Sequence, residues 1–265
     1  MRYIIDNDMH LHTNISICST DPEQIPENIL KHAQKYNLKT VVIADHFWDE
    51  RVEGLRPHYY GIQNYEHITK YLPLPKADGV RLIFGCETDM NVDNVIGVHE
   101  SRFDDFGFIV VPTTHWHLSE IIRDEVKPSN ELRVKTWFEK LDALLDSNLP
   151  LHKTGLAHMV CRAIARGKPE YPMFLNMLPS DELERVFTKA AEKGLGIEVN
   201  AEDMKYDPEE EDAILRIFKT AKACGCKFYL ASDAHDIKHL DESIQVFERA
   251  IDKIGLEESD KFILA

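Results

Sequence analysis

Residues 40–46, with the sequence TVVIADH, place a short apolar run directly before an aspartate and a histidine. The apolar part, residues 40–44, is β-branched and short, which is typical of a buried strand. Six further β-like runs occur along the chain, at residues 2–5, 80–86, 108–112, 155–158, 196–199 and 227–231. These runs predict seven strands.

Amphipathic helical patterns separate most of these runs. The first begins at Asp21-Pro22-Glu23, which offers an N-cap, an early proline and early negative charge. Similar patterns cover about residues 129–146, 180–193, 208–224 and 241–253. Alternation of strand and helix predicts parallel strands joined by right-handed crossovers. About seven such units favour a TIM-barrel-like α/β fold, a closed or nearly closed barrel, over an open sheet.

Composition limits the class of protein. The 265 residues are 43% hydrophobic and 29% charged, and no linker or repeat divides them, so we expect one domain over residues 1–265. A formal net charge of −15 makes nucleic acid an unlikely partner and opposes binding to an anionic membrane. No apolar run approaches the roughly 20 residues of a membrane span, and the N-terminus lacks secretory features. We therefore expect a cytoplasmic protein whose five scattered cysteines are thiols.

Metal-ligand residue types follow almost every predicted strand. In chain order they are Asp8, His10 and His12; Asp45 and His46; Glu87 and Asp89; His115 and His117; His158; Glu198 and Asn200; and Asp233 and His235. In a β/α barrel the carboxyl ends of the strands gather at one mouth. Imidazoles and carboxylates suit Zn²⁺, Mn²⁺ or Fe, and this many donors exceed the needs of one tetrahedral zinc ion. The pattern predicts a cluster of two or three divalent ions.

The motifs resemble those of the polymerase and histidinol phosphatase (PHP) superfamily of metal-dependent phosphoesterases. The matching motifs are DMHLHT at 8–13, ADH at 44–46, GCE at 85–87, the strand-end His115, GLAH at 155–158 and SDAH at 232–235. The resemblance implies a distorted (β/α)7 barrel with a trinuclear site at its mouth. It implies a first metal on His10, His12, Glu87 and Asp233, a second on Glu87, His115 and His158, and a third on His46 and His235.

The resemblance also implies a further ligand for the third metal, commonly a histidine six residues beyond the second histidine of the first motif. Cys18 stands at that position here. A thiolate is a good metal ligand, so Cys18 could replace the imidazole. Alternatively, the third site is weak, empty, or completed by water or Asp21.

Other residues are candidates for supporting roles. Asp8 is expected to orient a ligand histidine from behind, and Asp45 either does the same or caps the following loop. Arg162 is the best candidate for a contact to phosphate, and Asn200 for another contact to substrate. His46, His117 and Asp45 are candidates for the acid that protonates the leaving group.

The leading functional prediction is hydrolysis of a small phosphate monoester by a metal-activated hydroxide. Within the resembled family, histidinol phosphate, from histidine biosynthesis, is the best single named substrate. Alternatives are phosphodiester, nuclease-type or amide hydrolysis at a related site, and a metal-binding module without turnover. The sequence leaves the oligomeric state open.

Overall fold

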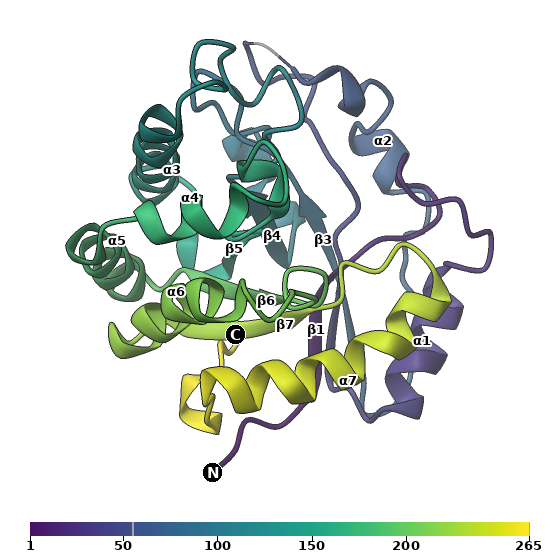
Figure 1. The fold of residues 1–265 in the computed structure, drawn as a ribbon. Helices are drawn as coiled ribbons and strands as arrows, with labels where there is room; N and C mark the ends of the chain where they lie inside the picture. The colour runs from purple at the N-terminus through teal and green to yellow at the C-terminus, as the bar shows by residue number, and fades with distance from the viewer. Residues whose placement is uncertain (55, 265) are drawn as a thin grey trace.

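The computed structural model describes residues 1–54 and 56–264. In this part of the chain seven strands form one parallel sheet in sequence order, which confirms the distorted (β/α)7 barrel (Figure 1). The strands are β1 (Asn7–Leu11), β2 (Thr40–Ile43), β3 (Arg81–Glu87), β4 (Phe108–Pro112), β5 (Thr154–Ala157), β6 (Gly196–Asn200) and β7 (Lys227–Ala231).

Helices surround the sheet on its outer side (Figure 1). They are α1 (Pro26–Lys35), α2 (Tyr65–Ile68), α3 (Asn130–Leu145), α4 (Tyr171–Met177), α5 (Ser180–Lys193), α6 (Glu211–Ala223) and α7 (Ile237–Ile254). The crossovers on either side of β3 carry short elements instead, including the 3₁₀ turns η1 (His58–Tyr60) and η2 (Glu100–Asp105). Within the described residues, none of the helices combines the length and apolar composition needed to cross a bilayer.

The first strand is not where the apolar run predicts it. Residues 2–5 form an entry segment in which Arg2 bridges Glu257 and Ile4 is half exposed, whereas β1 begins at Asn7. All five residues of β1 are buried, although three of them are polar. A rule based on apolar runs misses a strand whose buried side chains are mainly hydrogen-bonded polar groups.

Two helix starts also differ from prediction. Asp21 Oδ1 accepts a hydrogen bond from the Glu23 backbone N–H at 2.9 Å, which makes a turn, and α1 begins later, at Pro26. The last helix begins at Ile237 rather than near 241, because the Asp236 side chain accepts from the His239 N–H at 2.9 Å and caps it.

The barrel closes along a seam between β1 and β7. Two backbone bonds cross it beyond the end of β7, from Asp233 N–H to His10 O at 2.8 Å and from His12 N–H to Ala234 O at 3.0 Å. Two side chains of β1 also bridge this seam. Asn7 Oδ1 accepts a hydrogen bond from Leu230 N–H, and Asp8 Oδ1 accepts one from Ser232 N–H, each at 2.9 Å. Asp8 was predicted to orient the ring of a ligand histidine. Its hydrogen bond instead holds the seam.

Aromatic side chains fill the inside of the barrel. The Tyr229 and Phe108 rings meet edge to face at 5.2 Å, and Phe262, from the C-terminal segment, packs against both. Gly155 on β5 provides room for this packing, because a Cβ at that position would lie 2.6 Å from Tyr229 Cζ. The position therefore tolerates no side chain without movement of the aromatic cluster.

Gly155→Ala is expected to lower the free energy of unfolding by about 1–3 kcal/mol through overpacking against Tyr229. Urea denaturation of the wild type and the variant measures the difference. Gly61→Ala is the matched control, because Gly61 has helical dihedrals and its nearest neighbour would be His58 O at 3.4 Å. Equal stability of the Gly155 variant and the wild type would contradict this account of the barrel interior.

Candidate metal centre

A small cavity of about 210 Å³ lies at the mouth of the barrel. Its walls come from segments that follow six of the strands, because the carboxyl ends of parallel strands converge there. The lining residues are Cys18, His46, Tyr59, Glu87, Asp89, His115, His117, Leu118, His158, Cys161, Asp233 and His235. Most of the residues predicted as metal ligands therefore face one space.

Glu87, the last residue of β3, lies at the centre of five imidazoles. Its carboxylate oxygens are 2.8 Å from His46 Nδ1, 3.4 Å from His12 Nε2, 3.5 Å from His10 Nε2 and from His158 Nε2, and 3.9 Å from His115 Nε2. Glu87 is 1% exposed, and its Oε1 has no hydrogen-bond partner among the described residues. A buried carboxylate oxygen of this kind fits a bridging ligand between two cations.

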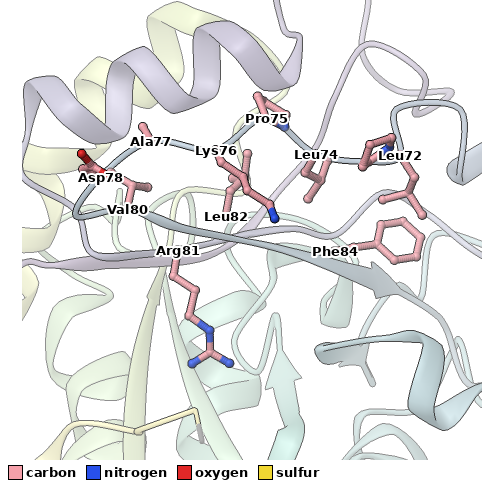
Figure 2. Close-up of a pocket in the computed structure, with 11 residues that line it drawn as sticks. Leu72, Leu74, Pro75, Lys76, Ala77, Asp78, Val80, Arg81, Leu82 and Phe84 are labelled. Carbon is pink, nitrogen blue, oxygen red and sulfur yellow. The ribbon is translucent and has the colours of Figure 1, made fainter.

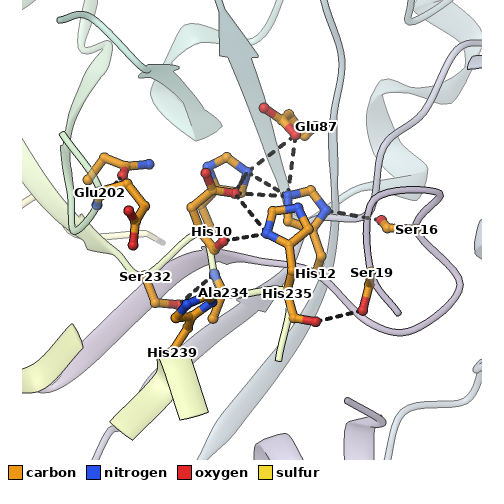
Figure 3. A network of polar contacts seen from close by, with 12 residues as sticks. His10, His12, Ser16, Ser19, Glu87, Glu202, Ser232, Ala234, His235 and His239 are labelled. Atoms are coloured by element: carbon orange, nitrogen blue, oxygen red, sulfur yellow. Dashed lines mark hydrogen bonds and ion pairs between the residues drawn. The ribbon is translucent and has the colours of Figure 1, made fainter. Parts of the chain in front are cut away.

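Two groups of donors meet at His10 on the seam side of Glu87. His10, His12 and Asp233 form one group and His10, Glu87 and His158 another, each with its donor atoms within 4.8 Å of one another. The Nε2 atoms of His10 and His12 are 3.2 Å apart (Figure 3). Asp233 Oδ1 lies 3.1 Å from His12 Nε2. The two histidine rings therefore direct their Nε2 atoms to the same place, as expected for residues two apart on a strand.

A third group contains Cys18. The donor atoms of His12, Cys18, His46 and His235 all lie within 4.8 Å of one another. Burial opposes ionisation of the thiol, but hydrogen bonds with His235 and His46 lower the pKa of Cys18 to about 6. Asp21, the alternative ligand, instead accepts hydrogen bonds from the backbone of Glu23 and Ile237. The structure thus brings Cys18 into the donor set and leaves Asp21 outside this group.

Asp45 acts on the loop after β1. One carboxylate oxygen accepts from Thr13 N–H and Ser16 Oγ–H, each at 2.7 Å, and the other from Thr13 Oγ–H at 2.8 Å. Ser16 Oγ in turn lies 3.0 Å from His12 Nδ1 (Figure 3). Asp45 is not among the lining residues of the cavity, so the structure places it as the cap of this loop and not as the predicted acid.

Two carboxylates that were predicted only as strand-end residues of metal-ligand type instead orient ligand histidines. Glu198 on β6 places Oε1 2.7 Å from His10 Nδ1 and accepts at Oε2 from the His158 N–H at 2.8 Å. Asp89 Oδ2 lies 3.2 Å from His115 Nδ1. Such contacts fix the tautomer and direction of a metal-ligating ring. The available signal was their position at strand ends beside ligand residues.

Asn200 and Arg162 do not take the substrate-facing places predicted for them. Asn200 lies with Nδ2 3.5 Å from His158 Nδ1, and its Oδ1 accepts from the Glu202 N–H, so it supports His158 and the loop after β6. The Arg162 guanidinium binds both oxygens of Glu210, at 2.6 and 2.5 Å, and is absent from the lining residues of the cavity. His117 does line the cavity, with its ring 5.5 Å from that of His115.

The electrostatics of the centre favour positive charge. Burial alone would lower the pKa of His10, but the carboxylates of Glu87, Asp233 and Glu198 raise it to about 10. The same field attracts a divalent cation. Two donors, His158 and Asp233, also have left-handed backbones, with φ of 54° and 51°, which are costly for residues other than glycine. Strain of this kind concentrates at functional sites.

A larger hollow of about 690 Å³ lies elsewhere, along the segment that leads into β3 (Figure 2). Its lining is mostly aliphatic and includes Leu72, Leu74, Pro75 and Leu82, with Asp78 as the carboxylate among its described residues. Its size exceeds that of the cavity at the barrel mouth, but its described lining residues form no group of metal donors.

Comparison with known proteins shows the fold. No family model matches the sequence, and no curated protein matches it. Among solved structures, histidinol phosphate phosphatase from Lactococcus lactis subsp. lactis, complexed with zinc, L-histidinol and phosphate, aligns with a TM-score of 0.51 and 13% identity. The alignment covers 92% of this chain and 93% of that one. A second alignment, to the metal-dependent tyrosine phosphatases YwqE from Bacillus subtilis and CpsB from Streptococcus pneumoniae, has a TM-score of 0.40 and 13% identity and covers 95% and 89%.

Glu198→Gln is expected to weaken binding of Zn²⁺ or Mn²⁺ by roughly 10- to 100-fold, because the neutral amide no longer fixes His10 as a strong donor. Metal titration with a competing chelator measures the affinity. Glu202→Gln is the control, since Glu202 pairs with Lys205 at the surface. Unchanged affinity in the Glu198 variant would remove this residue from the centre.

Cobalt substitution tests the thiolate. The Co²⁺-loaded protein is expected to show thiolate-to-cobalt charge-transfer absorption in the near ultraviolet, and Cys18→Ser to lose it, because sulfur is then missing from the shell. Cys161→Ser is the matched control, since Cys161 lines the same cavity outside the donor groups. A band that persists in the Cys18 variant would show that Cys18 is not a ligand.

Proposed function

We propose that this protein is a metal-dependent phosphoesterase that hydrolyses small phosphate monoesters. The observation that carries the proposal is the buried carboxylate of Glu87, which lies within 4 Å of five imidazoles and beside groups of imidazole, thiol and carboxylate donors. Such an arrangement suits adjacent divalent ions, and phosphoester hydrolysis is a reaction that clustered ions serve well. The lactococcal neighbour, which shares the fold and binds zinc and phosphate, agrees with this proposal.

Two or three cations are proposed, with the ligands that the motif resemblance implies; the donor groups of the described residues contain all of these ligands except His115. His10, His12, Glu87 and Asp233 would hold the first, and Glu87, His115 and His158 the second. Cys18, His46 and His235 would hold the third, with His12 beside them. Zinc suits the mixture of nitrogen and sulfur donors, and manganese and iron are the alternatives.

Bound cations would supply an activated water and neutralise charge on the phosphoryl group. The chain's own residues perform the remaining tasks. Glu198 and Asp89 hold the rings of His10 and His115 in fixed directions, which keeps the geometry constant through the reaction. His117, in the wall but outside the donor groups, is placed to pass a proton to or from the departing group.

The dimensions of the cavity favour a small ester. A volume of about 210 Å³ lies below the range of roughly 300–1,000 Å³ typical of sites that enclose a drug-sized ligand. Histidinol phosphate is our best single named substrate, which would place the protein in histidine biosynthesis. Phosphodiester or nuclease-type hydrolysis is the alternative, and the net charge of −15 disfavours a polyanionic strand. A metal-binding module without turnover is the non-enzymatic alternative.

Hydrolysis of p-nitrophenyl phosphate is expected to appear when Zn²⁺ or Mn²⁺ is added, and His10→Ala is expected to lower kcat/KM by at least roughly 100-fold. His239→Ala, on α7, is the control and should match the wild type. A second panel compares histidinol phosphate, nucleoside monophosphates and short oligonucleotides. Absence of turnover with every metal and ester would refute the phosphoesterase and leave the metal-binding module.

A further inference from the structure

The walls of the cavity contain few groups that remain free to meet a substrate. Seven of the lining residues are proposed metal ligands, and Asp89 is engaged with His115. Four others remain: Tyr59, His117, Leu118 and Cys161. Among the described residues that line the cavity there is no lysine or arginine. A phenol, an imidazole and a thiol are therefore the polar side chains of the wall that neither serve as proposed ligands nor orient one.

Tyr59 belongs to the turn η1, which is fixed to the site on both sides of this residue. His58 binds Glu120 Oε1 through its backbone N–H at 3.1 Å and through Nδ1 at 2.7 Å. Tyr60 is fully buried, and its hydroxyl donates to Asp89 Oδ2 at 2.7 Å. The turn is thus tied to the segment after β4 and to the residue that orients His115.

Tyr59 itself points into the cavity. Its ring meets the His46 ring edge to face at 5.2 Å, its hydroxyl reaches the Cys18 side chain, and the residue is half-buried. It therefore stands between the buried floor formed by Glu87 and the solvent. A phosphoryl group on this floor would direct its ester oxygen and the rest of the substrate outward, past Tyr59.

We propose that the Tyr59 hydroxyl binds the leaving-group oxygen of the substrate. This inference rests on the proposed phosphoesterase function. In the reaction, water adds to phosphorus, the bond from phosphorus to the ester oxygen breaks, and its electron pair remains on that oxygen. The departing oxygen then takes up the proton that the water loses, which yields an alcohol and inorganic phosphate. The Tyr59 O–H donates a hydrogen bond to this oxygen while its negative charge develops.

The dependence on the leaving group tests this role. Tyr59→Phe is assayed with p-nitrophenyl phosphate, whose leaving group is a weak base, and with 2-phenylethyl phosphate, whose alkoxide is a strong base. A hydrogen bond to the departing oxygen matters most where the negative charge on that oxygen is least stable, as in the phenylethyl alkoxide. The variant should therefore lose roughly 100-fold in kcat for the phenylethyl ester and less than about 3-fold for the nitrophenyl ester. Zinc content, measured by elemental analysis, should not change.

Tyr60→Phe is the matched comparison. It removes the neighbouring hydroxyl that supports Asp89, so it should slow both esters by the same factor. Equal losses for both esters in the Tyr59 variant, or no loss, would overturn the inference while leaving the phosphoesterase intact. A wild-type protein inactive toward both esters with every metal would refute the proposed function and this inference together.

Discussion

The contact of Glu87 with five imidazoles is the constraint on which the rest of the mouth depends. A carboxylate that is 1% exposed is costly unless positive charge surrounds it. Burial alone would raise the pKa of Glu87, but His46 and His10 hold it well below its usual value. The five rings come from β1 itself and from segments after β1, β2, β4 and β5, so surrounding this one carboxylate requires most of the barrel to be assembled. The fold and the site are therefore specified together.

The seam between β1 and β7 shows how closely scaffold and site are joined. The backbone bond from Asp233 to His10 that closes the barrel also places these two donors side by side. Asp8, two residues before His10, holds the same seam by accepting a hydrogen bond from the Ser232 N–H. The left-handed backbone of Asp233 occurs where the chain must turn out of the barrel directly after this contact. Its conformational cost is offset by closure and by the donor group that closure creates.

Strand-end chemistry was predictable from sequence, and the detailed partners were not. Apolar runs before His46, His115, His158 and Asp233 placed these residues at one mouth, because parallel strands end together. The rule failed at β1, where the buried side chains are mainly polar. The separate prediction that Arg162 contacts phosphate did not foresee that Glu210, far along the chain, would neutralise this arginine. The sequence did not predict that Glu198 contacts His10. That contact depends on the directions in which side chains point across the barrel, and residue spacing does not contain this information. Tyr59 lies in a crossover without regular periodicity, so its place at the cavity required the three-dimensional path of the chain.

The charge of the cavity wall has a consequence for the proposed reaction. Arginine and lysine normally neutralise a bound phosphate, but the described lining residues include neither. The basic residues that follow His158 in the same loop are all paired with carboxylates: Arg162 with Glu210, Arg166 with Glu170 and Lys168 with Asp207. Binding of an anionic ester must then draw on cations held by the imidazoles, while the surrounding carboxylates repel an anion that arrives first. The affinities for metal and for substrate are consequently coupled. By linkage, bound phosphate raises the affinity for the cations by the same factor as the bound cations raise the affinity for phosphate.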